Sequence, residues 1–218
     1  NIKNICLAGG LFANVKINQK INEIKGIKNI FVFPHMGDGG LTVGAACNLN
    51  FELTKKSKIK LGHVYYGQNF SDREIVRVLK KFKKKLLFKK LKNIEGAVVD
   101  ELMDNKVVGF FQGRMEFGPR ALGSRSILFH AKDKSANDWL NKKLKRTEFM
   151  PFAPVTPIEL ANKCYENWNK KNSCTPFMTQ TFKCKKDFIL RHPAVVHIDD
   201  TARPQVIDSK INKIYYNV

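Results

Sequence analysis

The chain has 218 residues, of which 43% are hydrophobic, including 16 phenylalanines. This content is enough for a folded core and excludes a disordered chain. Lysine and arginine exceed aspartate and glutamate by 39 − 19 = +20. Such an excess indicates either an anionic partner or an AT-rich genome that favours lysine codons. Most lysines are scattered, which favours the codon explanation, whereas the arginines cluster and are more informative about function.

The five cysteines are odd in number and form no C-x-x-C pair. This pattern predicts neither a disulfide framework nor a zinc site, and it favours a reducing, cytoplasmic compartment. No apolar run approaches the roughly 18 residues of a membrane span, and no signal peptide is visible. Because the chain starts at Asn1 and not at a methionine, we expect it to begin inside a larger protein.

The first fifty residues alternate between strand-like and helix-like patterns. Residues 3–10 (KNICLAGG) predict a buried strand that ends in a glycine turn, and residues 28–34 (KNIFVFP) predict a second strand. Between them, apolar residues recur at near-helical spacing and predict a helix, namely Val15, Ile17, Ile21 and Ile24. A glycine turn and a small-residue helix follow at 35–49. This order predicts an α/β fold with its turns on one side.

The next segments are more mixed. Residues 51–67 lack periodicity and predict a linker. Ser71 and Glu74 then form a capping box before a helix whose apolar stripe is Ile75, Val78, Leu79 and Phe82. The lysine-rich run at 80–93 is interpreted as a solvated helix end and strand rather than a binding patch. Later patterns predict a helix at 94–105, a strand at 106–113, a helix from Ser135 to Leu144, an irregular proline-rich segment at 149–157 and a strand at 193–200.

The most unusual stretch is QGRMEFGPRALGSRSIL, residues 112–128. Arginine presents a planar fork that matches two oxygens of a phosphate or carboxylate, and glycine lets backbone N–H groups approach an anion. The stretch therefore predicts a phosphate site, to which Ser124 and Ser126 would add hydroxyl donors. The alternative is that the arginines brace the loop, with Arg114 or Arg120 paired to Glu116.

Three further polar groups have both a functional and a structural interpretation. The run KKLKR holds Lys142, Lys143, Lys145 and Arg146, which suit a triphosphate or simply a helix C-terminus. The stretch HIDDTARPQ, residues 197–205, follows an apolar run and suggests a site more than a core; a metal site there is disfavoured. Asp38 lies between glycines, where a carboxylate is either a helix cap or a metal ligand, and the spacing alone favours the cap.

Five blocks appear in a fixed order: AGGLFANVKINQKI, FVFPHMGDGGLTVGAA, GRMEFGPRALGSRSIL, KLKRTEFMPFAP and HIDDTARPQ. Together they resemble the carbamoyltransferase family that includes the nodulation-factor and antibiotic O-carbamoyltransferases. The resemblance implies residues 1–55 as the tail of an actin-like (ASKHA) transferase domain and 56–64 as a linker. Residues 65–218 would form an α/β twisted-sheet domain similar to the carbamoyladenylate-forming tRNA-modification enzymes, incomplete at its C-terminus.

The resemblance also implies a two-step reaction. Carbamoyl phosphate and ATP, with Mg²⁺, would give carbamoyladenylate in the second domain. The carbamoyl group would then pass to an acceptor hydroxyl in the first domain, near a divalent metal such as Fe²⁺. By this resemblance, the family histidines that bind this metal would lie upstream of Asn1, and an NTSFN-type segment would lie beyond Val218. Met150 stands where arginine is common, and Asp200 stands where glycine is common, which places a carboxylate near the expected anion site.

By the same resemblance, Asp38 becomes a metal ligand instead of a cap. The expected contacts with carbamoyl and phosphate groups are Arg114, Arg120, Arg125 and Ser126, supplemented by Lys143, Arg146, His197, Thr201 and Arg203. Gly9, Gly10 and Asn14 would border the nucleotide or acceptor cleft. A homo-oligomer is compatible with the sequence. The alternatives are a basic RNA-binding or tRNA-modification module, disfavoured because few stacking aromatics accompany the arginines, and an inactive fragment.

Overall fold

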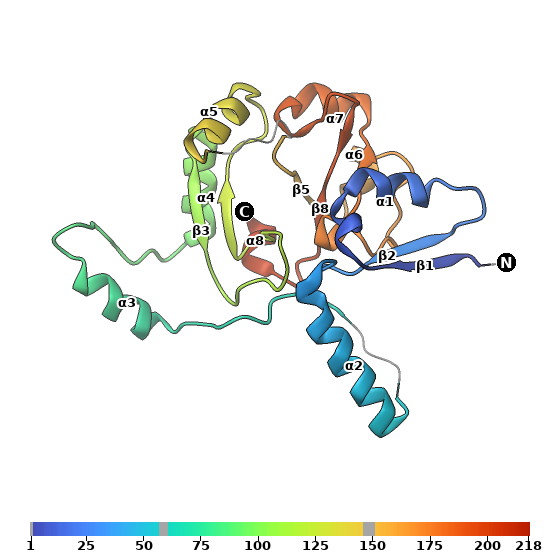
Figure 1. Ribbon diagram of the computed structural model, residues 1–218. Coiled ribbons are helices and arrows are strands. Elements are labelled where there is room, and N and C mark those ends of the chain that lie inside the picture. The colour runs from blue at the N-terminus through green and yellow to red at the C-terminus, as the bar shows by residue number, and fades with distance from the viewer. Residues whose placement is uncertain (1, 57–60, 146–150) are drawn as a thin grey trace.

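The N-terminal unit is a parallel strand pair connected by a helix. The computed structural model describes residues 2–56, 61–145 and 151–218 (Figure 1). Strands β1 (Asn4–Leu7) and β2 (Asn29–Val32) pair in parallel. Between them lie the 3₁₀ turn η1 (Gly10–Ala13) and helix α1 (Val15–Asn22). The predicted strand–turn–helix–strand order is confirmed, and buried Ile30 and Val32 form its core with Met36 and Cys174.

Helix α2 (Leu41–Thr54) follows the 3₁₀ turn η2 (Asp38–Gly40) and projects away from the rest of the molecule (Figure 1). Its last four residues, 51–54, lie in the segment that the sequence predicted to be a linker. That segment therefore begins as helix. At the far end of that segment, Val64 is buried against Leu122, Phe177 and Met178. The chain is therefore anchored in a core again before Gly67.

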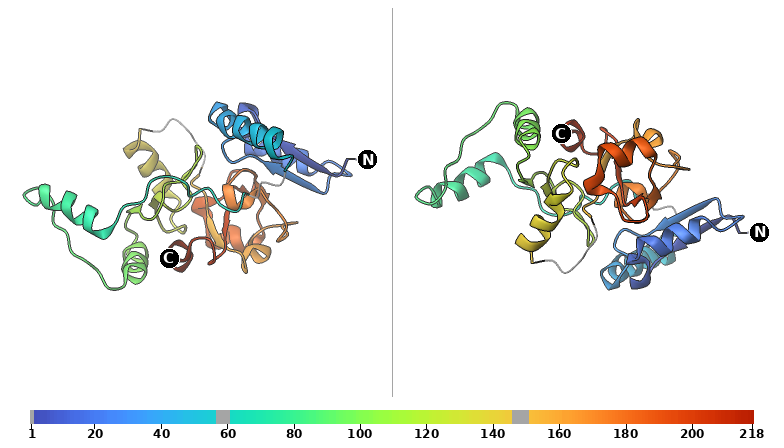
Figure 2. Two further views of the ribbon diagram at one scale, coloured as in Figure 1. Left: turned by 90° about the horizontal axis from the view of Figure 1, so that it is seen from below. Right: turned by 90° about the horizontal axis from the view of Figure 1, so that it is seen from above.

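Helix α3 (Asp72–Lys81) begins at the predicted capping box: Ser71 accepts from the backbone of Glu74, whose side chain accepts from Ser71. Its apolar stripe covers no core, since Ile75, Val78 and Phe82 are all exposed. Figure 2 shows α3 at the side of the molecule opposite the N-terminal unit. The strand expected within residues 80–93 is absent, and an irregular segment runs there instead.

Helix α4 (Ile94–Met103) and strand β3 (Val108–Phe111) form as predicted, and β3 pairs antiparallel with β4 (Arg125–Leu128). The glycine–arginine loop joins these two strands. Buried Val98, Phe110, Ile207 and Tyr215 pack together, which attaches α8 (Lys213–Asn217) to this hairpin. Gly123 lies directly beside the Tyr215 ring.

The remaining chain contains short elements around a second core. Strand β5 (Val155–Pro157) pairs in parallel with β8 (Gln205–Ile207), and β6 (Phe182–Lys183) pairs antiparallel with β7 (Thr201–Ala202). The other elements are α5 (Ser135–Lys143), α6 (Ala161–Cys164), η3 (Thr175–Phe177), α7 (Lys186–Arg191) and η4 (Pro193–Val195). Buried aromatic residues dominate this core: Tyr165, Trp168, Phe182 and Phe188.

Three local expectations for this region are wrong. Strand β5 includes Pro157 inside the segment expected to be irregular; proline is tolerated there because the strand pairs with only one neighbour. Residues 193–195 form a 3₁₀ turn instead of a strand, opened by Pro193. Ser135 is the first residue of α5 and not its cap, because its hydroxyl donates to Asp133.

The described residues thus form a mixed α/β structure with four two-stranded sheets. All five cysteines are free thiols. Within residues 2–56, 61–145 and 151–218, no helix is long and apolar enough to cross a membrane.

Candidate functional site

The glycine–arginine loop is organised by one buried carboxylate. Glu116 is 7% exposed, and its Oε1 accepts the backbone N–H groups of Leu122 (2.7 Å), Ser124 (2.6 Å) and Arg125 (3.2 Å). A carboxylate that gathers several N–H groups fixes a loop more firmly than a neutral acceptor. Glu116 was considered above as a partner of Arg114 or Arg120, and these bonds tie its carboxylate to the loop backbone.

Arg125 also holds this loop together. Its guanidinium donates to the carbonyls of Gln112 (2.9 Å), Ser124 (2.8 Å) and Gly113 (3.2 Å), and it stacks 3.5 Å from the Phe111 ring centroid. These bonds use three of the five N–H groups of a guanidinium, so two are left for another acceptor. Ser126, one residue on, accepts from the Gly123 N–H at 2.9 Å.

Arg120 extends from the loop to the N-terminal unit. Its Nη2 donates to the carbonyl of Ala13 at 3.0 Å, immediately before the start of α1. The neighbouring Phe117 ring lies 4.9 Å from the His35 ring, and Gly118 adopts φ +120° against the carbonyl of Pro34. The loop therefore lies at the junction of the N-terminal unit with the rest of the chain.

Arg114 points elsewhere. Its Nη1 donates to the Gly67 carbonyl at 3.3 Å. The three arginines donate to backbone carbonyls in three different segments. The guanidinium groups of Arg114, Arg120 and Arg125 therefore make separate contacts. The structure brings Arg120 to the junction with α1 and keeps Arg125 within its own loop.

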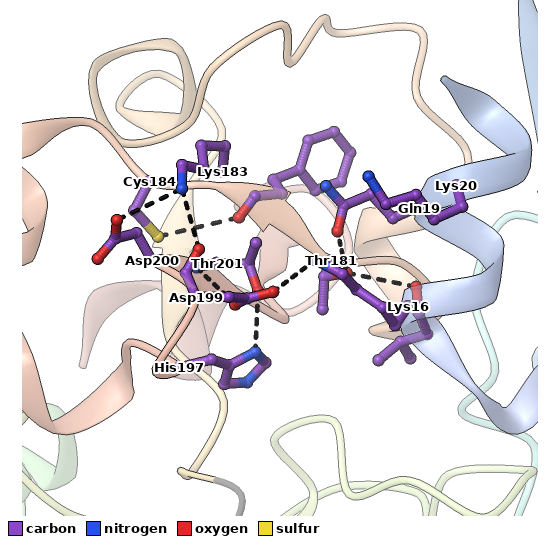
Figure 3. Close-up of polar contacts among 12 residues, drawn as sticks. Lys16, Gln19, Lys20, Thr181, Lys183, Cys184, His197, Asp199, Asp200 and Thr201 are labelled. Atoms are coloured by element: carbon purple, nitrogen blue, oxygen red, sulfur yellow. Dashed lines mark hydrogen bonds and ion pairs between the residues drawn. The ribbon is translucent and has the colours of Figure 1, made fainter. Parts of the chain in front are cut away.

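The polar segment 197–203 meets α1 at the same junction (Figure 3). Thr201 donates its hydroxyl to Asp199 (2.6 Å) and lies 3.0 Å from His197 Nδ1. Asp199 forms an ion pair with Lys16 in the first turn of α1. His197 and Thr201, both predicted site residues, are thus brought together. Lys16 was missed because nothing in its local sequence indicates a partner 183 residues away.

The charges at this junction shift two pKa values downwards. Burial lowers the pKa of His197, and the charges of Arg203 and Lys16 lower it further, against the opposing effect of Asp199. Partial burial would raise the pKa of Asp199, but hydrogen bonds from Lys16 and Thr201 outweigh burial and hold it well below its usual range. At neutral pH, His197 is therefore neutral and Asp199 ionised. We call the three cations Lys16, Arg120 and Arg203 the cationic junction.

Asp200 does not place its carboxylate in this junction. It adopts φ +58°, and its side chain lies 3.3 Å from Lys183 Nζ. Left-handed backbone of this kind favours glycine, which is the common residue at this place in the resemblance. The expectation that Asp200 would weaken anion binding therefore loses its geometric basis.

The other predicted residues have mainly local contacts. Lys143 lies exposed in the last turn of α5, where lysine suits the helix dipole. Asn14 caps α1 by accepting from Lys16 and Ile17. Gly9 adopts φ +115° and donates to the Met36 carbonyl, and Gly10 begins η1. Arg146 and Met150 lie outside the described residues.

Asp38 is exposed at the start of η2, and neither η2 nor α2 has a side-chain cap. The geometry thus offers no support for the cap that its spacing favoured. Among residues 2–56, 61–145 and 151–218, no group of three histidine, cysteine, aspartate or glutamate side chains can hold a metal ion. Since tight sites in proteins need several ligands, Asp38 and its described neighbours do not by themselves fit a bound metal.

A small recess, partly open to solvent, is lined in part by Leu122 of the loop. Gln205 and Tyr65 both donate to the Leu122 carbonyl at its wall, at 3.0 and 2.7 Å. None of the predicted site residues lines it; its lining is Gly62, His63, Val64, Tyr65, Leu122, Pro176, Phe177, Gln205, Val206, Ile207, Asp208, Ile211 and Asn212.

Two family models match the chain: the carbamoyltransferase N-terminus at residues 1–47 and the carbamoyltransferase C-terminus at residues 99–218. The loop and the segment 197–203 both lie in the second match. The chain belongs to the carbamoyltransferase family, as its sequence blocks indicated.

Relatives agree with this assignment. The uncharacterized protein MJ1051 of Methanocaldococcus jannaschii is 38% identical over the whole chain, which spans 41% of that relative. Nodulation protein NolNO of Sinorhizobium fredii is 33% identical over the whole chain, which spans 32% of it. Nodulation protein U of Rhizobium tropici is 30% identical over 94% of the chain, which spans 33% of it. The chain corresponds to the C-terminal portion of these longer proteins.

Proposed function

We propose that the chain is the adenylate-forming portion of an O-carbamoyltransferase. The observation that supports this most directly is the cationic junction. Lys16 from α1 pairs with Asp199 near His197, the charge of Arg203 lowers the pKa of His197, and Arg120 from the glycine–arginine loop donates to the carbonyl of Ala13, three residues before Lys16. Carbamoyl phosphate and ATP are both polyanions, and fixed cations reduce the repulsion between them.

The proposed reaction forms carbamoyladenylate and then transfers its carbamoyl group. Carbamoyl phosphate and water first give carbamate and phosphate; a carbamate oxygen then attacks the α-phosphorus of ATP, and pyrophosphate leaves. Finally an acceptor hydroxyl attacks the carbamoyl carbon, AMP leaves, and the hydroxyl proton passes to solvent. Holding both substrates in one place converts an encounter in solution into a positioned reaction, an advantage of up to about 7–11 kcal/mol.

The chain's residues would divide this work. Arg120 would hold phosphate oxygens, and Arg114 would join it by exchanging its contact with the Gly67 carbonyl for the substrate. Arg125 would offer its two remaining N–H groups while bracing the loop, and the Ser126 hydroxyl orients the same loop. His197, Thr201 and Arg203, with Lys143 and Arg146, complete the anion site, and Mg²⁺ accompanies ATP. The neutral imidazole of His197 supplies a proton acceptor beside the cations.

The N-terminal unit would be the end of an actin-like transferase domain. Its parallel β1–β2 pair with the α1 crossover is compatible with such a domain. Gly9, Gly10 and Asn14 would border its cleft, and Asp38 would contribute one ligand to a divalent metal, such as Fe²⁺, completed by side chains outside the described residues.

The test is carbamoyl-phosphate-dependent exchange of labelled pyrophosphate into ATP, measured in the protein that contains this chain. Arg120→Gln should reduce exchange by about 100-fold, as expected for loss of a charge that faces developing anions. The matched control is Arg191→Gln, since Arg191 lies exposed on α7 and pairs with Asp187 on the same helix. Full exchange in Arg120→Gln, or exchange that ignores carbamoyl phosphate, would refute the proposal.

A further inference from the structure

The contacts of Thr201 fix the position of its one hydroxyl hydrogen. Thr201 Oγ1 lies 2.6 Å from Asp199 Oδ1 and 3.0 Å from His197 Nδ1. Asp199 is ionised at neutral pH, since its pKa is lowered, and an ionised carboxylate only accepts hydrogen bonds. The hydroxyl hydrogen of Thr201 therefore points to Asp199. Towards His197, the same oxygen acts only as an acceptor.

This arrangement determines the tautomer of His197. Because Thr201 accepts, the ring hydrogen lies on Nδ1 and donates to the hydroxyl oxygen (Figure 3). Burial and the charges of Arg203 and Lys16 lower the pKa of His197, so the imidazole is neutral at pH 7 and Nε2 carries a free lone pair. Within the described part of the chain, Nε2 has no hydrogen-bond partner. The side chain thus offers one defined acceptor atom.

Further bonds hold this arrangement rigid. Asp199 pairs through Oδ2 with Lys16, and its Oδ1 also accepts the backbone N–H of Thr201 at 3.2 Å. The backbone N–H of His197 donates to the Thr201 carbonyl at 2.7 Å, which closes a tight turn between the two residues. Thr201 is 2% exposed, so water does not compete for its hydroxyl. The imidazole is therefore held in one orientation as well as in one tautomer.

A neutral imidazole with a free lone pair suits a step in which a neutral nucleophile loses a proton. Attack of carbamate on ATP needs no such base, because carbamate is already an anion. In the proposed reaction, protons are lost when water cleaves carbamoyl phosphate and when the acceptor hydroxyl is carbamoylated. The first of these steps would occur beside the cations that bind phosphate, where His197 lies, and the second would occur in the other domain.

We propose that Asp199 and Thr201 are positioning residues that direct Nε2 of His197 at the water that cleaves carbamoyl phosphate. The water oxygen bonds to the carbamoyl carbon, the bond from that carbon to the bridging oxygen breaks, and its electron pair leaves with phosphate. Nε2 takes a proton from the water and passes it to the released phosphate. The carbamic acid then loses its acidic proton to solvent. The substrate rests on the proposed function, whereas the tautomer follows from the hydrogen bonds alone.

The tautomer is tested by nitrogen NMR at pH 7 on the protein that contains this chain, with labelled histidine. The spectrum of His197→Gln identifies the signals of His197. We expect a protonated Nδ1 and an unprotonated Nε2 in the parent protein. Thr201→Val removes the acceptor and should transfer the hydrogen to Nε2 in a large fraction of molecules, whereas Thr201→Ser should preserve the parent spectrum. His192, which packs on Phe188, is the internal control.

The catalytic step is tested by supplying carbamate directly, because ammonium bicarbonate solutions contain carbamate at equilibrium. Carbamoyl-phosphate-dependent pyrophosphate exchange should fall about 100-fold in His197→Gln and about tenfold in Thr201→Val, while Thr201→Ser should rescue it. Ammonium bicarbonate should restore most of the lost exchange in His197→Gln and Thr201→Val. It should not restore exchange in Arg120→Gln, whose charge is needed after cleavage as well.

Three results would overturn the proposal: a hydrogen on Nε2 in the parent protein, a tautomer that Thr201→Val leaves unchanged, or a loss of exchange in His197→Gln that carbamate does not restore. If the parent protein shows no exchange with carbamoyl phosphate or with carbamate, the proposed function itself fails. The NMR spectrum reports the tautomer in either case, so the two failures are distinguishable.

Discussion

Lys16 in the first turn of α1 forms an ion pair with Asp199, which precedes β7. Both side chains are 43% exposed, and they lie at the rim of a buried polar interface (Figure 3). Inside that interface, Thr181 donates to Gln19 (2.7 Å) and Asn18 donates to the Thr179 carbonyl (2.7 Å). These buried hydrogen bonds join α1 to residues 179–181, and the ion pair joins α1 to the segment that contains His197.

Replacing Asp199 by asparagine should have a small effect on stability and a distinct pH signature. The expected loss at pH 7 is about 0.5–1 kcal/mol, because water screens a pair at this exposure. The folded pKa of Asp199 is depressed, so its contribution is complete above the ordinary carboxyl pKa and is lost as pH falls toward the lower folded value. Urea unfolding of the parent protein and of Asp199→Asn at pH 7 and pH 3 should show a smaller difference in unfolding free energy at pH 3.

Asp187→Asn is the control for this experiment. Asp187 pairs with Arg191 on the surface of α7, at 70% exposure for both side chains. Its removal should change stability by less than Asp199→Asn at pH 7. If the Asp199→Asn deficit grows on acidification, the assigned direction of the pKa shift is wrong.

Replacing Glu116 should lower the stability of the protein more than replacing any other carboxylate. Glu116→Ala leaves the buried N–H groups of Leu122 and Ser124 and the partly buried N–H of Arg125 without their acceptor, at about 1–3 kcal/mol for each unsatisfied buried donor before water enters. Glu116→Gln keeps an oxygen acceptor and should lose less than half as much. Hydrogen exchange reports this directly: the amides of Leu122, Ser124 and Arg125 should exchange faster in Glu116→Ala, while the amides of β5 should not. Unchanged protection at Leu122 would contradict the assignment.

The sequence predicted the N-terminal unit and the start of α3 well because their signals are local. Glycine turns, apolar runs and the Ser71–Glu74 box each span a few residues, and the matching elements appear where expected. The prediction of a strand at 193–200 was wrong because Pro193 and the residues that follow it form a 3₁₀ turn. Periodicity does not distinguish these two outcomes in so short a run.

The candidate site was predictable in its residue types but not in its partners. The arginines and the segment 197–203 stand out by composition, and His197 and Thr201 do meet. Their joining to Lys16, and the attachment of Arg120 to Ala13, depend on how distant elements pack. The role of Glu116 was equally hidden, since a backbone acceptor and a side-chain ion partner have the same sequence signature.

Gly123→Ala should unfold the hairpin region. A Cβ atom at Gly123 would lie 2.0 Å from the Tyr215 ring, and its φ of +99° strains any side chain. Because Tyr215 is buried at 5% exposure, it has no room to move away. The expected loss exceeds about 3 kcal/mol, combining backbone strain with overpacking. Gly113→Ala is the control, since its φ is +53° but its Cβ would meet open space. That variant should lose only about 1–2 kcal/mol, and equal losses would show that Tyr215 does not matter.

Asp200 tests whether the turn before β7 requires glycine-like backbone. Its φ of +58° is costly for most side chains, and its ion pair with Lys183 is about half exposed on both sides. We therefore expect Asp200→Gly to leave stability unchanged or raise it by up to about 1 kcal/mol, because relief of strain offsets the lost ion pair. Asp200→Val should lower stability by about 1–2 kcal/mol, since a β-branched residue is least tolerated at positive φ. The urea midpoints of Asp200→Gly and Asp200→Val measure these changes in stability. Lys183→Met removes the ion pair without changing the backbone at Asp200, so its midpoint gives the contribution of the ion pair alone. A glycine variant less stable than the valine variant would show that the carboxylate, and not the backbone, stabilises this turn.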